Sequence, residues 1–349
     1  MTAKRVVIAD DSELFIDVLS DLVRREPGLS LVGVAKNGRD AVSQVKALRP
    51  DLVVMDVLMP ELDGLAATEQ IMAEQPTPIL ILSSDPRSRT GRLSLEALAR
   101  GALEAMPKPE QLPFEGRAKR GLLDRMRLLA DVAVVRHVRG RRHQWREPEA
   151  PPPSTRRPPV MVSTPIVAIA ASTGGPQALV DVVSLLPVDL RAAVLVVQHM
   201  SDAFLPVFAE WLQKSTALVV SIAQEGTSPV AGHIYVAGAG RHLELKRGCF
   251  SLPGAEPEER HCPSADRLFA SLARDAPGRT YGVVLTGMGR DGTSGLLHLR
   301  QAGGETAAQD ASSSVVDGMP RAAREAGAAA KVLPLASVAS ELVRWAEAQ

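Results

Sequence analysis

The stretch Ile166-Val-Ala-Ile-Ala-Ala-Ser172-Thr-Gly-Gly-Pro176-Gln-Ala-Leu179 decides how the second half of the chain folds. Residues 166–171 have the length and the β-branching of a buried strand. The apolar run stops at Ser172-Thr-Gly-Gly-Pro176, and a helical pattern begins near Gln177. A buried strand that turns directly into a helix is the repeating unit of α/β sheets. We therefore predict an α/β domain around this stretch.

Ser172 stands at the turn between that strand and that helix. Backbone N–H groups at a helix N-terminus can receive an oxyanion, so the position suits an exposed nucleophile. A simpler interpretation is that Ser172 and Thr173 only cap the helix, which is the commoner role of these residues. The other strand ends of the domain must distinguish the two interpretations.

Strand-like runs alternate with helical patterns throughout residues 164–349, which predicts a mainly parallel sheet with helices on it. We expect the two runs on either side of Gly238-Ala239-Gly240 to form a hairpin. The predicted strands are 166–171, 193–197, 219–223, 233–236, 242–245, 281–286, 305–309 and 331–335. The predicted helices begin near Gln177, Ala203, Ser264, Thr293, Pro320 and Ser337.

Two further polar residues follow strands of this predicted sheet. His199 comes after the strand 193–197, and Asp291 lies in the glycine-rich loop after the strand 281–286. A serine at neutral pH needs an imidazole to take its proton, and the imidazole needs a carboxylate to fix its tautomer. Ser172, His199 and Asp291 therefore predict a serine hydrolase. The other histidines form no ligand spacing and are interpreted as ordinary surface or structural residues.

Two other motifs compete with this interpretation. Residues 170–174 do not match Gly-x-Ser-x-Gly, and the order Ser…His…Asp differs from that of the corresponding hydrolases. The loop Gly287-Met-Gly-Arg-Asp-Gly292 fits Gly-x-Gly-x-x-Gly between a strand and a helix, and Asp310 lies 18 residues beyond Gly292. This pattern keeps a dinucleotide site open as an alternative, although that site would leave Ser172 and His199 without a role.

The first half of the chain contains five β/α repeats, which predict a doubly wound parallel sheet. The expected strands are 5–9, 31–35, 52–55, 79–82 and 102–106. The expected helices begin near Glu13, Gly38, Gly64, Ser88 and Leu112.

Acidic residues gather at the strand ends of this first sheet. Asp10 and Asp11 follow the first strand, and Asp56 follows the third. Three converging carboxylates would repel each other unless a hard cation such as Mg²⁺ neutralised them. Ser83 and Ser84 follow the fourth strand and Lys108 lies just past the fifth, and a hydroxyl and an ammonium there could hold further oxygens, such as those of a phosphoryl group. We therefore predict a Mg²⁺ site at this edge of the sheet, with neighbouring groups able to hold further oxygens.

The segment between the two sheets reads as a helix followed by a linker. A helical pattern over 117–138 either closes the first domain or leads away from it. An arginine cluster at 139–142 and six prolines between 148 and 159 then predict an extended linker. We accordingly expect domains at 1–113 and 164–349, joined by the helix and linker at 114–163.

Composition excludes several classes of function. Aromatic residues make up only 3% of the 349 residues, and 40 basic residues balance 40 acidic ones. Base stacking or coating of nucleic acid is therefore not expected. Two cysteines without motif spacing fit a reducing cytoplasm, and neither a signal peptide nor a membrane span is apparent. We expect a cytoplasmic monomer that is not inserted in a membrane.

Two families resemble this chain. The first half resembles a response regulator receiver domain, most strongly at Asp56-Val-Leu-Met-Pro-Glu-Leu-Asp-Gly64. Residues 164–349 resemble the catalytic domain of the chemotaxis protein-glutamate methylesterases, the CheB family. The matching blocks are Ala171-Ser-Thr-Gly-Gly-Pro176, Gln198-His-Met200, Thr286-Gly-Met-Gly-Arg-Asp-Gly292, Gln309–Ser314 and Gly318-Met-Pro-Arg-Ala-Ala323.

The catalytic-domain resemblance implies a regulated esterase. Ser172 would be the nucleophile, His199 the base and Asp291 its orienting carboxylate, with the N–H groups of Met288 and Thr173 receiving the oxyanion. The substrate would be glutamyl methyl esters of a methylated chemoreceptor, with deamidation of receptor glutamines as a second activity. No cofactor is expected in this domain.

The receiver resemblance implies control by phosphorylation. Asp56 would take phosphate from a sensor histidine kinase, with Asp10, Asp11 and Asp56 on Mg²⁺. By the same matching, Ser83 rather than Ser84 would contact the phosphoryl oxygens together with Lys108. We expect the receiver to obstruct the esterase until Asp56 is phosphorylated. Three departures from the family patterns affect the switch and receptor recognition rather than the chemistry. They are Ala105 in place of an aromatic residue, Cys262 in place of an arginine, and Gly238-Ala-Gly240 in place of a proline-rich loop.

Overall fold

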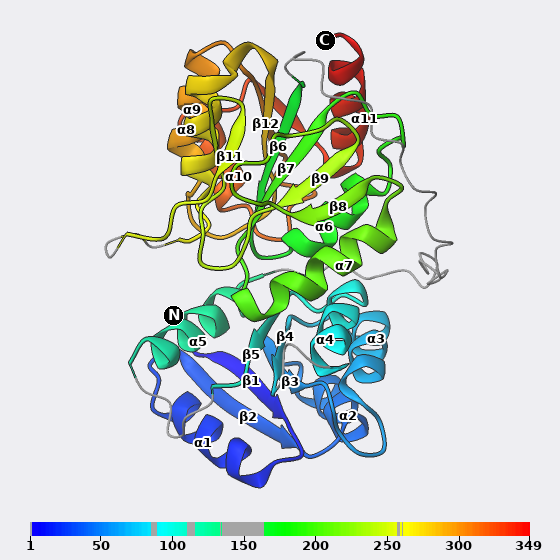
Figure 1. The fold of residues 1–349 in the computed structure, drawn as a ribbon. Coiled ribbons are helices and arrows are strands. Elements are labelled where there is room, and N and C mark those ends of the chain that lie inside the picture. The colour runs from blue at the N-terminus through cyan, green and yellow to red at the C-terminus, as the bar shows by residue number, and fades with distance from the viewer. Residues whose placement is uncertain are drawn as a thin grey trace. The chain divides into compact units, whose positions relative to one another are not determined.

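The computed structural model describes residues 2–84, 89–109, 116–132, 134, 164–256, 259 and 261–349. The chain divides into two compact units, Met1–His143 and Gln144–Gln349, and each is described by itself (Figure 1). The domain boundaries expected at 113 and 163 fall outside the described residues and stay predictions, as does the proline-rich linker.

The first unit is a five-stranded parallel sheet in the order β2-β1-β3-β4-β5. This order confirms the predicted doubly wound fold. Its strands are β1 (Lys4–Ala9), β2 (Leu29–Ala35), β3 (Leu52–Asp56), β4 (Ile79–Ser83) and β5 (Glu104–Pro107). Its helices are α1 (Glu13–Arg24), α2 (Gly38–Leu48), α3 (Gly64–Glu74), α4 (Arg89–Ala99) and α5 (Gly116–Leu129). The helix starts expected at Ser88 and Leu112 lie outside the described residues.

Helix α5 closes the first unit rather than leading away from it. Leu122, Leu123 and Met126 of α5 are buried in one core with residues of α1 and of the strands. These positions recur three and four residues apart, so they form one apolar stripe on the helix. Burial of that stripe against the sheet completes the core of the unit.

The second unit is built on a seven-stranded sheet in the order β14-β13-β12-β6-β7-β9-β8, in which all neighbouring strands are parallel. This confirms the second predicted α/β domain. Its strands are β6 (Ile166–Ala171), β7 (Ala193–Gln198), β8 (Val219–Ile222), β9 (His233–Val236), β12 (Thr280–Val284), β13 (Glu305–Gln309) and β14 (Lys331–Leu333). Its helices are α6 (Gly175–Val183), α7 (Leu205–Ser215), α8 (Ala265–Asp275), α9 (Thr293–Gln301), α10 (Met319–Glu325) and α11 (Leu335–Glu347).

The hairpin predicted around Gly238-Ala239-Gly240 is wrong. Strand β9 pairs in parallel with β7 and β8, so it does not fold back on the run that follows it. The hairpin instead joins β10 (Glu244–Lys246) to β11 (Cys249–Ser251), which pair antiparallel outside the main sheet. Its two turn residues, Arg247 and Gly248, both have positive φ, the conformation of a tight two-residue turn. Arg-Gly is a weaker turn signal than Asn-Gly, which is why the sequence did not reveal it.

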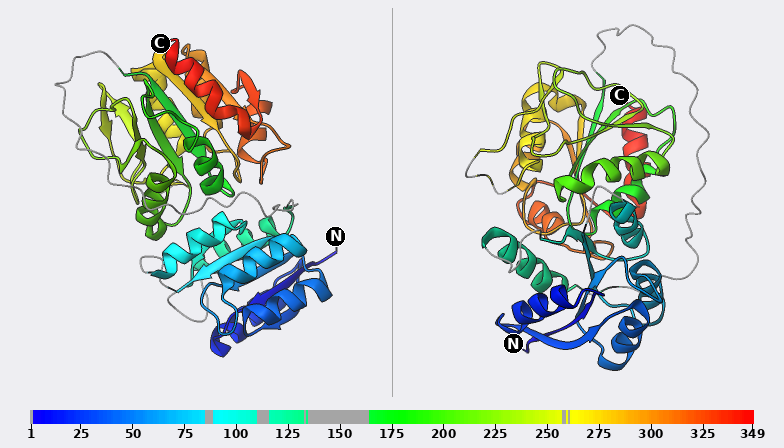
Figure 2. Two further views of the ribbon diagram at one scale, coloured as in Figure 1. Left: turned by 90° about the vertical axis from the view of Figure 1, so that its right-hand side faces the viewer. Right: turned by 60° about the horizontal axis from the view of Figure 1, so that its bottom comes forward.

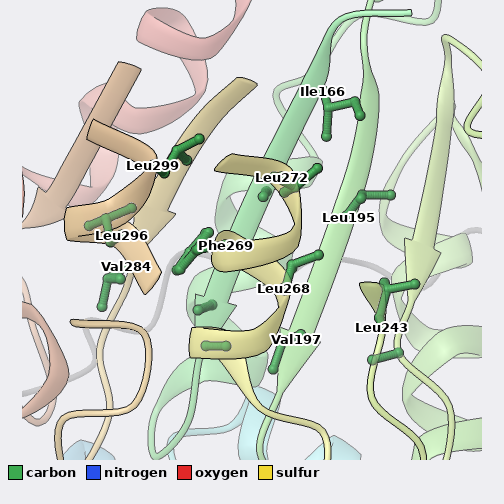
Figure 3. Packing of buried hydrophobic residues seen from close by; sticks show 14 of the residues in the cluster. Ile166, Leu195, Val197, Leu243, Leu268, Phe269, Leu272, Val284, Leu296 and Leu299 are labelled. Atoms are coloured by element: carbon green, nitrogen blue, oxygen red, sulfur yellow. The ribbon is translucent and has the colours of Figure 1, made fainter. Parts of the chain in front are cut away.

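Helices cover both faces of the seven-stranded sheet (Figure 1 and Figure 2). Helices α8, α9 and α10 lie on one face, and α6, α7 and α11 lie on the other. Figure 3 shows Leu268, Phe269 and Leu272 of α8 directed at the sheet, where they meet Val197 and Leu195 of β7. This packing fixes α8 over β6 and β12 and sets the position of its N-terminus.

Within the described residues, no helix is both long enough and apolar enough to span a membrane.

Candidate active site

The candidate site lies where the strand order of the second sheet reverses. From β6 the chain continues to β7 on one side, whereas β12, on the other side of β6, leads on to β13 and β14. The carboxyl ends of β6 and β12 therefore border the crevice in which parallel α/β sheets bind their ligands. Ser172 follows β6, His199 follows β7 and Asp291 lies in the loop after β12.

Ser172 is held at this edge by its main chain. Its N–H donates to the carbonyl oxygen of Thr286 at 3.0 Å, and its own carbonyl oxygen accepts from the N–H of Gly175 at 2.8 Å. The N-cap of α6 is Gly174, with a φ of +74°, so neither Ser172 nor Thr173 occupies the capping position. The helix-capping interpretation of Ser172 is therefore wrong.

His199 and Asp291 form a hydrogen-bonded pair, although 92 residues separate them in the sequence. Nε2 of His199 lies 2.8 Å from Oδ2 of Asp291. The other ring nitrogen, Nδ1, is buried and has no hydrogen-bond partner in the described part of the chain. A carboxylate can only accept, so the proton of the neutral ring lies on Nε2 and Nδ1 keeps a free lone pair. Nδ1 is thus the atom able to act as a base.

The N-terminus of α8 holds Asp291 in its ionised form. Oδ1 of Asp291 accepts from the Ser264 hydroxyl at 2.9 Å and from the N–H of Asp266 at 3.0 Å. Oδ2 accepts from the N–H of Ala265 at 2.7 Å. Burial raises the pKa of Asp291, but the His199 ring and these N–H donors outweigh it, and the pKa lies below its usual range. The carboxylate therefore stays charged beside His199.

Helices α8 and α9 brace each other through their first turns. Asp291, just before α9, accepts from N–H groups of α8, while Oδ1 of Asp266, in α8, accepts from the N–H of Gly295 in α9 at 2.7 Å. Burial and the charge of Asp291 raise the pKa of Asp266, although backbone N–H donors such as that of Gly295 act to lower it. Each helix N-terminus thus binds a carboxylate supplied by the other segment, which fixes the loop that carries Asp291.

Ser172 reaches the same edge as the pair without a hydrogen bond to it. Among the described residues, no hydrogen bond joins Ser172 Oγ to the ring of His199. The backbones of the two residues are nevertheless tied together, because Nε2 of Gln198 donates to the carbonyl oxygens of Ser172 and His199 at 2.9 Å each. Catalytic hydrogen bonds are often long before substrate binds, so this geometry is compatible with a nucleophile and its base.

The expected oxyanion residues flank Ser172 on two sides. Thr173 follows it directly and is buried, and Met288 comes after Gly287, which packs against the serine. A Cβ at Gly287 would lie 2.7 Å from the Cβ of Ser172 and 2.5 Å from Sδ of Met319. Only glycine allows the β12 loop to approach the serine so closely. The roles of Met288 and Thr173 stay predictions.

Sequence reasoning missed the part that His261 plays in this site. Its ring stacks on that of His199, with the centroids 4.6 Å apart and an angle of 7° between the planes. Its interpretation as an ordinary surface histidine overlooked this contact, because no local pattern relates the two residues. Gln198 was missed for the same reason, although it stands directly before His199 in a block that the sequence had singled out.

The carboxylates of the first unit converge as predicted from the strand ends. Asp10, Asp11 and Asp56 each offer a carboxylate oxygen, and these atoms lie within 4.8 Å of one another. Nζ of Lys108 lies 2.6 Å from Oδ2 of Asp10 and 2.8 Å from Oδ2 of Asp56. Burial raises the pKa of Asp56 above its usual value, even though Lys108 acts to lower it. A set of hard oxygen donors that repel each other fits Mg²⁺.

The two serines after β4 differ sharply in their surroundings. Ser83 is fully buried, and its Oγ has no hydrogen-bond partner in the described residues, whereas Ser84 is exposed. Lys108 donates its N–H to the carbonyl oxygen of Ser83 at 2.7 Å, which keeps the ends of β4 and β5 together. This arrangement favours Ser83 over Ser84 as the hydroxyl that would meet a phosphoryl group.

Comparison with known proteins assigns both units to families. Residues 6–113 match the response regulator receiver domain, and residues 167–342 match the CheB methylesterase family. The chain belongs to the CheB methylesterase family. A protein-glutamate methylesterase/protein-glutamine glutaminase 2 of Anaeromyxobacter dehalogenans (strain 2CP-C) is 44% identical over 331 residues, which cover 95% of this chain and 94% of that protein.

Other CheB relatives are similarly complete. A protein-glutamate methylesterase/protein-glutamine glutaminase 4 of Myxococcus xanthus (strain DK1622) is 40% identical over 97% of this chain and 96% of its own length. Among solved structures, the CheB methylesterase catalytic domain of Thermotoga maritima is 34% identical with a TM-score of 0.50, covering 52% of this chain and 99% of that chain. The resemblance noted in the sequence is confirmed, and this CheB-family chain is a hydrolase that carries a receiver domain.

The glycine-rich loop of this CheB-family domain is used for packing rather than for a dinucleotide. Gly287 makes room for Ser172, and a Cβ at Gly292 would lie 3.2 Å from the Cβ of Ala265. Asp291, inside the loop, is bound to α8 and His199. Asp310 is bound by the hydroxyls of Ser312 and Ser313. Packing thus accounts for the first and last glycines of the pattern without a pyrophosphate.

Proposed function

We propose that this chain is a phosphorylation-controlled serine esterase that hydrolyses glutamate γ-methyl esters on chemoreceptors. The observation that carries the proposal is the His199–Asp291 pair, whose unpaired Nδ1 lies at the sheet edge that also bears Ser172. An ionised Asp291 stabilises the imidazolium that forms when His199 takes a proton. The names of the curated relatives supply the substrate class, protein glutamate methyl ester.

The first half of the reaction forms an acyl-enzyme. Nδ1 of His199 removes the hydroxyl proton of Ser172 as Oγ attacks the ester carbonyl carbon. The N–H groups of Met288 and Thr173 are the predicted donors to the resulting oxyanion. When the tetrahedral centre collapses, the C–O bond to the methoxy group breaks, and His199 gives its proton to the departing methanol.

The second half releases the receptor carboxylate. His199 takes a proton from a water molecule, whose oxygen attacks the acyl carbon, and the proton passes to Ser172 Oγ as the ester bond to the serine breaks. A glutamine side chain can enter the same cycle with ammonia as the first leaving group. Deamidation of receptor glutamines is therefore the proposed second activity.

The receiver unit is the proposed control on this chemistry. Asp56 would accept phosphate from a sensor histidine kinase, and Asp10, Asp11 and Asp56 would hold Mg²⁺, which neutralises carboxylate and phosphoryl oxygens. Lys108 already contacts two of these carboxylates, and the buried hydroxyl of Ser83 is unpaired among the described residues. Phosphorylation would shift the population of receiver conformations toward one that leaves the esterase accessible.

The test is methanol release from a glutamate-methylated receptor fragment. The Ser172→Ala variant loses the atom that forms the acyl-enzyme, so its rate should fall by roughly 10³-fold or more. Ser184→Ala serves as the matched control, because Ser184 lies at the C-terminal end of α6, away from Ser172, and its hydroxyl donates only to the carbonyl oxygen of Asp181 among the described residues. Its rate should equal that of the wild type.

Two other functions make different predictions in the same experiment. Unchanged methanol release from Ser172→Ala would reject the esterase mechanism. A dinucleotide enzyme would bind NAD(P) saturably, with binding weakened by changes at Gly287 or Asp310. A phospho-dependent adaptor would release no methanol and would keep its partner after the serine change.

A further inference from the structure

A second histidine, His242, lies behind Asp291 at the end of a chain of hydrogen bonds. It is fully buried in the segment before β10. The N–H of Ser264 donates to Nδ1 of His242 at 3.2 Å, and the hydroxyl of the same Ser264 donates to Oδ1 of Asp291 at 2.9 Å. A single residue therefore connects His242 to the carboxylate that orients His199.

The direction of these hydrogen bonds fixes the tautomer of His242. A backbone N–H can only donate, so Nδ1 must present its lone pair to Ser264. The proton of the neutral ring then lies on Nε2, which is 2.8 Å from Oε2 of Glu259. His242 is thus held as the Nε2–H tautomer by a donor on one side and an acceptor on the other.

Glu259 is well suited to accept that proton. It receives a hydrogen bond from the N–H of Glu256 and another from Nη1 of Arg267, at 2.8 Å each. The N–H of Glu256, opposed by burial and aided by Arg267 and His242, lowers the pKa of Glu259 to about 2. The side chain is therefore a carboxylate that can only accept at neutral pH.

Ser264 is the residue through which His242 would act. It is the N-cap of α8, and its hydroxyl oxygen accepts from the N–H of Arg267 while its hydroxyl proton points to Asp291. The N–H of Ser264 is buried, and removal of its acceptor would leave an unpaired buried donor. If Ser264 shifted so that its N–H found another acceptor, its hydroxyl bonds to Asp291 and to the N–H of Arg267 would shift as well. Asp291 would then move with it.

We propose that His242 is a positioning residue of the esterase, which as the neutral Nε2–H tautomer fixes Ser264 and thereby aligns Asp291 with His199. This inference rests on the proposed esterase function. His242 makes no bond to Ser172 or His199, so it acts only through Asp291. It extends the hydrogen-bonded pair of His199 and Asp291 by Ser264, His242 and Glu259.

Two substitutions of His242 distinguish the effect of its hydrogen-bond acceptor from the effect of its side-chain volume. In His242→Asn the side-chain oxygen can take the place of Nδ1 and accept from Ser264, whereas His242→Leu offers no acceptor. Because a small misplacement of a catalytic group costs up to about 100-fold in rate, kcat of the Leu variant should fall roughly 10- to 100-fold with KM little changed. The Asn variant should recover kcat to within about threefold of the wild type.

The matched control is His233→Leu, at a half-buried histidine of β9 whose ring hydrogen-bonds the carbonyl oxygen of Ala231 and stacks on Tyr235. It should leave kcat unchanged. Wild-type kcat in His242→Leu, or equal losses in the Asn and Leu variants, would overturn the proposal. Thermal unfolding of each variant establishes that it is folded.

Nuclear magnetic resonance of the imidazole nitrogens tests the arrangement without substrate. In the wild-type protein His242 should show a protonated Nε2 and an unprotonated Nδ1, and a protonated Nδ1 would overturn the proposal even if His242→Leu does not fold. In the Leu variant the Nε2 proton signal of His199 should shift, since Asp291 has moved. If the wild type releases no methanol, the esterase function fails, while these signals still decide whether His242 is the Nε2–H tautomer bonded to Ser264.

Discussion

Asp291 is the residue on which the candidate site depends most. It accepts four hydrogen bonds, three from the first turn and N-cap of α8 and one from His199. The same carboxylate thus stabilises a helix N-terminus and sets the tautomer of the base. Charge at this one position therefore couples local stability to catalysis.

Replacement of Asp291 by Asn, which hardly changes the volume of the side chain, should disable the esterase and lower the stability of the fold. The neutral amide no longer stabilises the His199 imidazolium, so kcat should fall by roughly 10³- to 10⁴-fold. The N-terminus of α8 should lose about 1 kcal/mol of stabilisation with the carboxylate charge. Methanol release and chemical denaturation of the variant measure the two effects.

The pH dependence of stability provides a control for Asp291→Asn. The folded-state pKa of Asp291 is depressed, so its stabilisation is complete above the ordinary value of 3.8 and is lost as the pH falls below it. The difference in unfolding free energy between wild type and variant should therefore shrink in acid. A difference independent of pH would show that the charge does not matter.

At the scale of elements, the position of the loop between β12 and α9 depends on its close contacts with neighbouring segments. Its N–H and carbonyl groups at Gly287 bond Val316, Gly318 and Met319. Because Gly287 has no side chain, Ser172 and Met319 can approach the backbone of the loop closely. The loop, the serine turn and the start of α10 are thus packed as one unit around the site.

The Gly287→Ala substitution should separate these elements. The added Cβ would lie 2.7 Å from the Cβ of Ser172 and 3.0 Å from its backbone nitrogen, so the β12 loop or the serine turn must move. We expect a stability loss of about 1–3 kcal/mol and at least a roughly 10-fold loss of kcat.

Gly278→Ala is the matched control for Gly287→Ala. Nothing lies within 4 Å of a Cβ at Gly278, which belongs to a short 3₁₀ turn before β12. This variant should keep the wild-type rate of methanol release. Full activity of Gly287→Ala would contradict the close packing of Ser172 against the loop.

The C-terminal helix α11 docks on Tyr281 of β12. The ring of Tyr281 is buried, its hydroxyl donates to Glu341 of α11 at 3.3 Å, and Trp345 packs edge-on at 5.6 Å. Burial, aided by the charge of Glu305, raises the pKa of Tyr281 to about 12. The neutral phenol is therefore part of the docked state.

Alkaline pH should consequently loosen this helix. The folded-state pKa of Tyr281 exceeds its ordinary value of 10, so its stabilisation is complete below pH 10 and is lost between about pH 10 and 12. The loss should be on the order of 2 kcal/mol and should be absent in Tyr281→Phe. Unfolding curves of the two proteins across this range measure it, and parallel pH dependences would contradict the assignment.

At the scale of the whole molecule, each unit has a hydrophobic core of its own. The core of the second unit contains residues of its sheet and of α8, α9 and α10, and every member comes from residues 164–349 (Figure 3). The first unit is closed by α1 and α5 on one face of its sheet. The esterase unit should therefore fold when the receiver is removed.

Residues 160–349 alone should hydrolyse receptor methyl esters faster than the unphosphorylated full chain. The physical reason is that removal of the receiver abolishes the proposed obstruction, while a small phosphodonor should release it in the full chain. Methanol release from both proteins, with and without the donor and Mg²⁺, measures the effect. The Asp56→Asn full chain is the control that should not respond to the donor.

Equal rates for the two proteins and no response to the phosphodonor would reject autoinhibition. Ala105, on β5, has no ring, so any response must leave the receiver without rotation of a ring at this position. A donor response in the full chain would show that another route exists.

The sequence alone determined the two α/β sheets and the side chains at their carboxyl edges. Apolar runs of strand length and helical periodicity are local signals, and in a parallel sheet they place every strand end on one edge. Asp10, Asp56, Ser172, His199 and Asp291 could all be found in this way. The resemblance of short blocks to known families then supplied the chemistry.

Only the tertiary structure decided which atoms meet at those edges. Asp291 fixes the Nε2–H tautomer of His199, and His261 stacks on the same ring. Gln198 bonds the backbone of Ser172, and Ser264 links His242 to Asp291. All of these contacts join segments that lie far apart in the sequence. Such contacts depend on the strand order of the sheet and on the position of the α8 N-terminus. No periodicity in the sequence predicts these contacts, because the residues next to each partner carry no pattern that points to the other partner.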